Sequence, residues 1–177
     1  MENKKKNWCY MGIAALVIAL LLALDQWTKH LAVVCLKGQP SYVLIDGVLE
    51  LDYLENRGAA FGVLQDQQWL FAVLTVAFLI FAWVVFWKIP KTPHFLPIFW
   101  LLVVLTAGAI GNFIDRITQK YVVDFISFVL IHFPVFNVAD IYVTVAVIAA
   151  FLLILFFYKE EDFDMLLKKG SKNDGRM

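Results

Sequence analysis

Four long runs of apolar residues constrain the fold of this chain more than any other feature. They cover residues 8–24, 69–87, 95–111 and 141–158, and none of them contains a charged residue. A helix needs about 20 apolar residues to cross the hydrocarbon of a bilayer, and flanking residues can complete the shorter runs. Across the chain 62% of residues are hydrophobic and mean hydropathy is +0.75, well beyond a soluble domain. The sequence therefore predicts a mainly α-helical, polytopic membrane protein with four transmembrane helices.

The connections between these runs are short, so little chain remains for a separate soluble domain. We expect a single integral-membrane domain over residues 1–177, with helices at about 9–33, 69–88, 95–114 and 139–158. The lysine-rich start followed by an apolar run is also typical of a secretory signal peptide. No small-x-small cleavage site follows it, so we expect an uncleaved anchor.

The positive charges of the chain predict its orientation in the membrane. Ten of the 15 lysine and arginine residues lie before the first run, between the second and third, and after the fourth (Lys4, Lys5, Lys6; Lys88, Lys91; Lys159, Lys168, Lys169, Lys172, Arg176). Cytoplasmic segments of membrane proteins carry an excess of lysine and arginine. Both termini and residues 89–94 are therefore expected in the cytoplasm, and residues 36–68 and 115–138 on the outer side.

Charge and cysteine content exclude several classes of protein. The formal net charge is zero, which argues against a nucleic-acid-binding protein. Cys9 and Cys35 are expected at opposite edges of the membrane, so they cannot form a disulfide within one chain. His30, His94 and His132 are scattered along the sequence and show no ligand spacing. We therefore expect no metal site and no cofactor.

A segment between the first two spans, at about 41–62, has the pattern of β-structure. Apolar Leu49, Leu51 and Tyr53 alternate with acidic Glu50 and Asp52, and this alternation is typical of a strand. The preceding Asp-Gly pair at 46–47 favours a two-residue hairpin turn. We expect a small β-hairpin or sheet on the extracytoplasmic face. The following NRGAAFG, residues 56–62, is either an ordinary tight turn or a segment whose backbone approaches a ligand closely.

Polar residues occur at the ends of two predicted spans. Asp25 and Lys29 are four residues apart on one helical face and can form an ion pair, either as a structural contact or as support for a polar site. Asn112, Asp115 and Arg116 share a face of the third span, where Arg116 can hold a carboxylate in a forked contact. These polar groups can also simply terminate a helix. The small residues Gly108 and Gly111 allow close packing of helices (residues 107–116 read AGAIGNFIDR).

Two aspartates, Asp124 and Asp140, bracket an otherwise apolar stretch. Residues 125–136 are too few to cross the bilayer and return as helices, so we expect an interfacial loop that brings both carboxyl groups to the same membrane face. Two adjacent carboxyl groups near hydrocarbon share one proton. Such a pair can activate a water molecule and polarise a peptide carbonyl, which is aspartic proteolysis. Alternatively, each aspartate caps a helix, and Asp140 is well placed to be the N-cap of the fourth span.

Five sequence blocks in order resemble the lipoprotein signal peptidase family, also called signal peptidase II or prolipoprotein signal peptidase. They are DQWTK (25–29), NRGAAFG (56–62), AGAIGNFIDR (107–116), VVDF (122–125) and FNVAD (136–140). The resemblance places the catalytic residues at Asp124 and Asp140. It assigns substrate binding or support of this pair to Asp25, Lys29, Asn56, Gly58, Gly108, Asn112, Asp115, Arg116, Asn137 and Ala139. Ala107 departs from the family, which often has glycine there.

The resemblance implies a membrane-embedded aspartic endopeptidase of lipoprotein processing. Such an enzyme removes the signal peptide of a diacylglyceryl-modified prolipoprotein by cleaving before the lipidated cysteine. The expected location is the bacterial cytoplasmic (inner) membrane, with the active site at the extracytoplasmic face, membrane lipids as neighbours and a monomeric state.

Two other classes of function fit the polar residues less well. In a transporter, Asp25, Asp124 and Asp140 would relay protons, but the chain has no internal repeats. In a scaffold protein they would only join helices.

Overall fold

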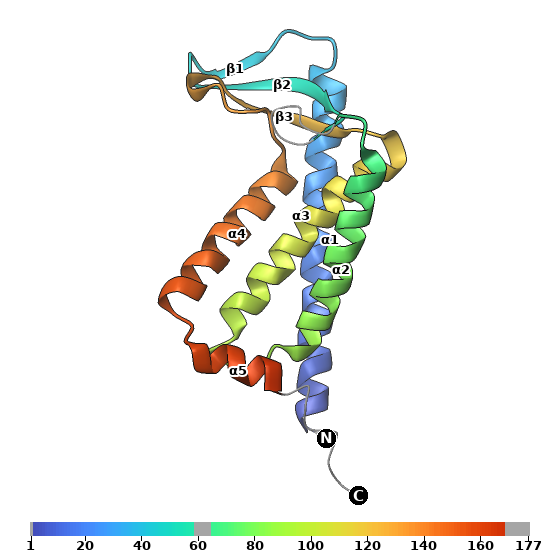
Figure 1. Cartoon of the computed structure of the whole chain (residues 1–177). Coiled ribbons are helices and arrows are strands. Elements are labelled where there is room, and N and C mark those ends of the chain that lie inside the picture. The colour runs from blue at the N-terminus through green and yellow to red at the C-terminus, as the bar shows by residue number, and fades with distance from the viewer. Residues whose placement is uncertain (1, 59–64, 169–177) are drawn as a thin grey trace, which may run out of the picture.

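The computed structural model describes residues 2–58 and 65–168 (Figure 1). In these residues four helices are long and apolar enough to cross a membrane: α1 (Glu2–Leu36), α2 (Gln68–Lys88), α3 (Leu96–Gln119) and α4 (Val138–Phe156). They overlap the four predicted spans. Helix α1 begins earlier than predicted, and both α1 and α3 end later. Residues 59–62 of the NRGAAFG segment, and those beyond 168, lie outside the described part.

Helix α3 is the central helix of the bundle, since it contacts α1, α2 and α4 and is the most buried of the four. Its first half packs into an apolar core in which Phe99 and Val103 are fully buried, together with Phe86 of α2 and Ala14 of α1. The other three helices expose most of their apolar side chains. Such surfaces are expected on helices that face lipid rather than water.

A fifth helix, α5 (Glu160–Lys168), lies at the end of the bundle near the N-terminus (Figure 1). Its first turn is held by Asp162, which accepts a hydrogen bond from the Lys159 backbone N–H at 2.9 Å and forms an ion pair with His94 at 3.0 Å.

A three-stranded antiparallel sheet covers the opposite end of the bundle (Figure 1). Its strands are β1 (Tyr42–Ile45), β2 (Leu49–Asn56) and β3 (Val122–Phe128), in the order β1-β2-β3. The predicted hairpin is present as β1 and β2. Its turn has three residues rather than two, with Gly47 at φ 68° and the Val48 N–H donating to the Ile45 carbonyl at 3.0 Å. A glycine suits this left-handed conformation because it has no Cβ to clash.

Strand β3 was not predicted from the sequence, which suggested only an interfacial excursion for residues 125–136. The first half of β3 is buried on both faces, so its sequence lacks the alternation that identifies a half-exposed strand. It pairs along the free edge of β2, where it satisfies backbone groups that would otherwise lack partners. The chain then returns through a short 3₁₀ helix, η2 (Val129–Ile131), and forms a bridge between Ile126 and Phe136.

Two glycines of α3 allow the close helix packing that the sequence predicted. A Cβ atom on Gly108 would lie 2.6 Å from the carbonyl oxygen of Ala139 and 2.8 Å from Cγ2 of Val143, both on α4. A Cβ atom on Gly111 would lie 2.6 Å from Oδ2 of Asp25 on α1. Both distances are far below a normal contact, so α3 can approach its neighbours only with glycine at these positions.

We predict that Gly108→Ala lowers the stability of the folded protein because the new methyl group must push α3 and α4 apart. Overpacking of this kind costs about 1–3 kcal/mol, which corresponds to a melting temperature lower by roughly 2–12 °C. Thermal unfolding of purified protein in detergent measures the shift. Gly12→Ala is the matched control, because nothing lies within 4 Å of a Cβ at Gly12. An unchanged melting temperature for Gly108→Ala would contradict the packing described here.

Candidate active site

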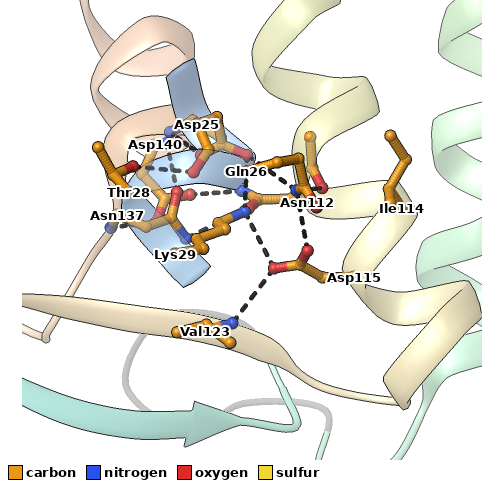
Figure 2. A network of polar contacts seen from close by, with 12 residues as sticks. Asp25, Gln26, Thr28, Lys29, Asn112, Ile114, Asp115, Val123, Asn137 and Asp140 are labelled. Carbon is orange, nitrogen blue, oxygen red and sulfur yellow. Dashed lines mark hydrogen bonds and ion pairs between the residues drawn. The ribbon is translucent and has the colours of Figure 1, made fainter. Parts of the chain in front are cut away.

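Polar side chains of α1, α3 and the start of α4 meet at the sheet end of the bundle (Figure 2), and side chains of β2 and β3 join them. They come from α1, β2, α3, β3 and α4, and most are buried although they are charged or polar (Asp25, Lys29, Asn56, Asn112, Asp115, Asp124, Asn137 and Asp140). Burial of a charge away from water is costly unless the charge is paired and hydrogen-bonded. The contacts of this cluster therefore decide whether it can exist.

Lys29 is the centre of the cluster. Its Nζ lies 3.0 Å from Asp25 Oδ2, 3.0 Å from Asp115 Oδ2 and 2.9 Å from Asn112 Oδ1 (Figure 2). An ammonium group has three N–H donors, and these three acceptors satisfy all of them. The predicted ion pair between Asp25 and Lys29 is confirmed, and it belongs to a network rather than to an isolated pair at the membrane surface.

The two carboxylates of this network also hold backbone groups of other elements. Asp25 Oδ1 accepts a hydrogen bond from the Ala139 backbone N–H at 2.9 Å, in the first turn of α4. Asp115 Oδ2 accepts one from the Val123 backbone N–H of β3 at 3.3 Å. Asp25 thus links Lys29 to α4, which carries Asp140, and Asp115 links Lys29 to β3, which carries Asp124.

Asp124 projects from β3 and is held by two side-chain amides. Its Oδ1 accepts a hydrogen bond from Asn137 Nδ2 at 2.6 Å, and its Oδ2 accepts one from Asn56 Nδ2 at 2.8 Å. Asn56 is fixed in turn, because its Oδ1 accepts the Gly58 backbone N–H at 2.9 Å. Burial, followed by the negative charge of Asp140, raises the pKa of Asp124 from 3.8 to about 6.

Asp140 belongs to the first turn of α4. Its Oδ2 accepts a hydrogen bond from the Asn137 backbone N–H at 3.1 Å, while Asn137 Oδ1 accepts the Asp140 backbone N–H at 3.1 Å. This reciprocal pair is a capping box. The N-cap is therefore Asn137, not Asp140 as the alternative interpretation of the sequence suggested. Asp140 Oδ1 accepts a further hydrogen bond from Asn112 Nδ2 at 2.8 Å.

One residue, Asn137, contacts both aspartates and the lysine network. Its side-chain amide donates to Asp124 Oδ1 at 2.6 Å and to Asn112 Oδ1 at 3.2 Å, and its carbonyl oxygen accepts from Asp140. Every polar atom of this buried side chain is used, which fixes the orientation of its amide. The positions of the two carboxyl groups relative to each other thus depend on a single helix cap.

Both aspartates line one cavity of about 500 Å³. Its polar wall consists of Asn56, Gly58, Asn112, Arg116, Asp124 and Asp140. The remaining wall is mostly apolar and comes from β3, the loop after it and α4 (Val122, Phe128, Ile131, Phe133, Pro134, Val135, Phe136, Ile141, Thr144 and Val145). A mostly apolar cavity with a few convergent polar groups is typical of a site that binds an amphipathic ligand.

Arg116 lines the cavity but does not hold a carboxylate in the forked contact that the sequence suggested. Its guanidinium lies 4.6 Å from the ring centre of Phe71, and its Nη atoms make long contacts of 3.4 and 3.5 Å with the carbonyl oxygens of Asn112 and Gly58. Its buried Nε has no hydrogen-bond partner among the described residues. Arg116 therefore affects the two aspartates through its charge rather than through a contact.

The other predicted site residues have packing roles. Gly108 lies against Ala139 at the contact between α3 and α4, and neither residue lines the cavity. The sequence analysis missed Gln26, whose Nε2 donates to Asp115 Oδ1 at 3.0 Å and to Asp25 Oδ2 at 3.2 Å. The sequence did contain one indication of this role, since Gln26 directly follows Asp25 near the end of the first predicted span. In residues 2–58 and 65–168 no group of three or more His, Cys, Asp or Glu residues could hold a metal ion.

Comparisons with known proteins agree with one another. The family model for Signal peptidase (SPase) II matches residues 17–157. A lipoprotein signal peptidase of Streptococcus thermophilus (strain CNRZ 1066) is 43% identical over 145 residues, which cover 82% of this chain and 92% of the relative. One of Streptococcus pneumoniae (strain ATCC BAA-255 / R6) is 43% identical over 153 residues, covering 85% and 95%.

Two solved structures of bacterial membrane enzymes, determined by the in meso method, share the fold. The one at 2.3 Å resolution has a TM-score of 0.72 and 28% identity, covering 95% of this chain and 96% of that one. The one at 1.9 Å resolution has a TM-score of 0.73 and 32% identity, covering 84% and 96%.

We predict that Lys29→Met strongly destabilises the protein, because it leaves Asp25 and Asp115 buried without their cation. Removing one partner of a buried ion pair costs about 3–5 kcal/mol. The measurement is thermal unfolding in detergent, with Lys37→Met as the control. Lys37 also pairs with a carboxylate, Glu55 at 2.9 Å, but its side chain is 52% exposed, so its replacement should change stability little. Equal losses for the two variants would show that the Lys29 network does not stabilise the fold.

Proposed function

The chain belongs to the signal peptidase (SPase) II family, and we propose that it is an aspartic endopeptidase whose catalytic residues are Asp124 and Asp140. It is a bacterial membrane protein and a peptidase. Its substrate is a diacylglyceryl-modified prolipoprotein, which it cleaves immediately before the lipidated cysteine, releasing the signal peptide.

One observation carries this assignment. A buried carboxyl group from a strand and a partly buried one from a helix terminus line the same cavity, and each accepts a hydrogen bond from a side-chain amide. Formal charges explain why such a pair keeps one proton. Lys29 and Arg116 supply two positive charges and Asp25 and Asp115 two negative charges, so no cation is left over for the dyad. One ionised dyad member gives the site a net negative charge, and a second would double that charge in a low-dielectric site.

The reaction needs one ionised and one protonated carboxyl group. The ionised group takes a proton from a water molecule, whose oxygen bonds to the carbonyl carbon of the scissile peptide, and the protonated group gives its proton to the carbonyl oxygen. The tetrahedral diol then collapses. The carbon–nitrogen bond breaks, the amine of the cysteine receives the proton taken from water, and a hydroxyl proton of the diol returns to the dyad. The pair again holds one proton, and one water has been consumed.

The shape of the cavity supports a lipid-bearing substrate. Its apolar wall, from Phe128 through Val145, offers surface for acyl chains and for an apolar signal-peptide segment, while the peptide bond lies against the polar wall. The exposed apolar residues Leu130, Ile131 and Phe133 beside the cavity suit contact with membrane lipids. A substrate that remains in the bilayer then reaches the dyad at a depth where water is still available.

The proposed orientation places the sheet and the dyad on the extracytoplasmic side of the cytoplasmic membrane, with both termini in the cytoplasm. It is supported by the lysines near the N-terminus and α5, which lie at the end of the bundle opposite the sheet (Figure 1). One copy of the chain supplies both members of the proposed dyad to one cavity, and the proposed working unit is a monomer.

We predict that Asp124→Asn and Asp140→Asn each lower the cleavage rate at least about a thousandfold, because each change removes a group that takes or gives a proton. The assay incubates purified protein in detergent with a diacylglyceryl-modified prolipoprotein and follows release of the signal peptide. Asp162→Asn, at the opposite end of the bundle, is the matched control and should cleave like the wild type. Cleavage near the wild-type rate by either dyad variant would remove that residue from the catalytic pair.

A further inference from the structure

The two aspartates of the proposed dyad have different surroundings, and the difference assigns their roles. We propose that Asp140 is the ionised member, which activates water, and that Asp124 carries the shared proton. Lys29 sets this order through the amide of Asn112 and so acts as a positioning residue. This inference rests on the proposed function, which requires one proton on the pair but does not say where it lies.

Asp140 has the surroundings of an ionised carboxylate. It occupies the first turn of α4, where the unpaired N–H groups of a helix favour negative charge. One of its oxygens accepts a backbone N–H and the other an amide N–H. Lys29 and Arg116 act electrostatically on both aspartates, so the helix terminus and the backbone N–H are what distinguish Asp140 from Asp124.

Asp124 has the surroundings of a proton carrier. It lies on β3 and is buried, and it contacts the terminus of α4 through the Asn137 side chain rather than through a backbone N–H. Burial raises the pKa of Asp124, and the negative charge on Asp140 raises it further, to about 6. Its two amide partners occupy one direction on each oxygen, which leaves a lone pair of Asp124 to hold a proton toward the cavity.

Lys29 links the ionic network to this asymmetry. Its ammonium group can only donate, so it requires an acceptor from Asn112, and the carbonyl oxygen of Asn112 therefore faces it at 2.9 Å. The amide nitrogen of Asn112 then necessarily faces Asp140, at 2.8 Å. Asn137 makes the same demand on the carbonyl oxygen at 3.2 Å. A flipped Asn112 would turn its oxygen toward Asp140 and would require a proton there.

All charged groups around the dyad enter this account. They are Asp25 and Lys29 from α1, Asp115 and Arg116 from α3, Asp124 from β3 and Asp140 from α4, while β2 contributes the neutral Asn56. Asp25 and Asp115 each form an ion pair with Lys29, and their other hydrogen bonds come from backbone N–H groups and from Gln26 rather than from the dyad.

The decisive measurement is a carbon-13 NMR titration of full-length protein labelled at aspartate Cγ, in detergent and without substrate. Spectra of Asp124→Asn and Asp140→Asn assign the two signals. We expect the Asp140 signal to ionise at a lower pH than the Asp124 signal, which should lose its proton as the pH rises through about 6. Ionisation of Asp124 first, or of both groups in one step, would overturn the inference.

The role of Lys29 has its own test, in the pH dependence of kcat/KM. The acid limb reports protonation of the base and the alkaline limb loss of the proton from the acid. The double variant Lys29→Gln/Asp115→Asn removes one charge of each sign. Its acid limb should move to higher pH by about one unit, so that kcat/KM at pH values below the limb falls about tenfold. The alkaline limb should stay where it is. Lys29→Arg, which restores donors, should move the acid limb less, and Lys37→Gln not at all.

A uniform loss of rate without a shift of the limb would show that Lys29 is only structural. If the double variant does not fold, the NMR titration of the wild type still decides the order of ionisation. Failure of the proposed function is distinguishable, because it would appear as retained cleavage in the Asp124→Asn and Asp140→Asn variants. Loss of cleavage in both, with Asp124 ionising first, would refute the assignment of roles alone.

Discussion

The structure depends on one buried ammonium group whose three donors all have acceptors. Lys29 could not leave water without Asp25, Asp115 and Asn112, and those residues could not be buried without it. The acceptors come from α1 and α3, and the two carboxylates also accept hydrogen bonds from backbone N–H groups of α4 and β3. The free-energy cost of burying the Lys29 charge is therefore offset only when all four elements are correctly placed. The same requirement positions both aspartates of the proposed dyad.

Helix termination and the proposed chemistry use the same atoms. Asn137 caps α4, Asp140 completes the capping box, and the remaining donors of the Asn137 amide reach Asp124 and Asn112. The capping box ties Asp140 to a backbone N–H, and Asp124 is held by the side-chain amides of Asn137 and Asn56. The glycines of α3 complete this arrangement, since Gly111 leaves space for the carboxylate of Asp25.

Some of this could be predicted from the sequence because it depends on local pattern. Uncharged apolar runs identify the spans, spacing of four identifies the pair of Asp25 and Lys29, and an Asp-Gly pair identifies the hairpin. Strand β3 could not be predicted, because its strand character comes from pairing with β2 and its buried half shows no alternation. The central role of Asn137, the identity of the α4 cap and the contacts of Arg116 depend on side-chain directions in three dimensions. Sequence spacing does not contain that information.

The central claim is that Asp124 and Asp140 act together on one peptide bond within the cavity. The most direct measurement is a crystal structure of the protein bound to a substrate-like lipopeptide in which a hydroxymethylene group replaces the scissile carbonyl. A hydroxyl group of this kind takes the place of the tetrahedral diol. The account predicts that its oxygen lies within hydrogen-bonding distance, about 2.6–3.2 Å, of a carboxyl oxygen of each aspartate, with the lipid chains along the apolar wall. A hydroxyl group bound to neither aspartate, or to only one of them, would contradict it.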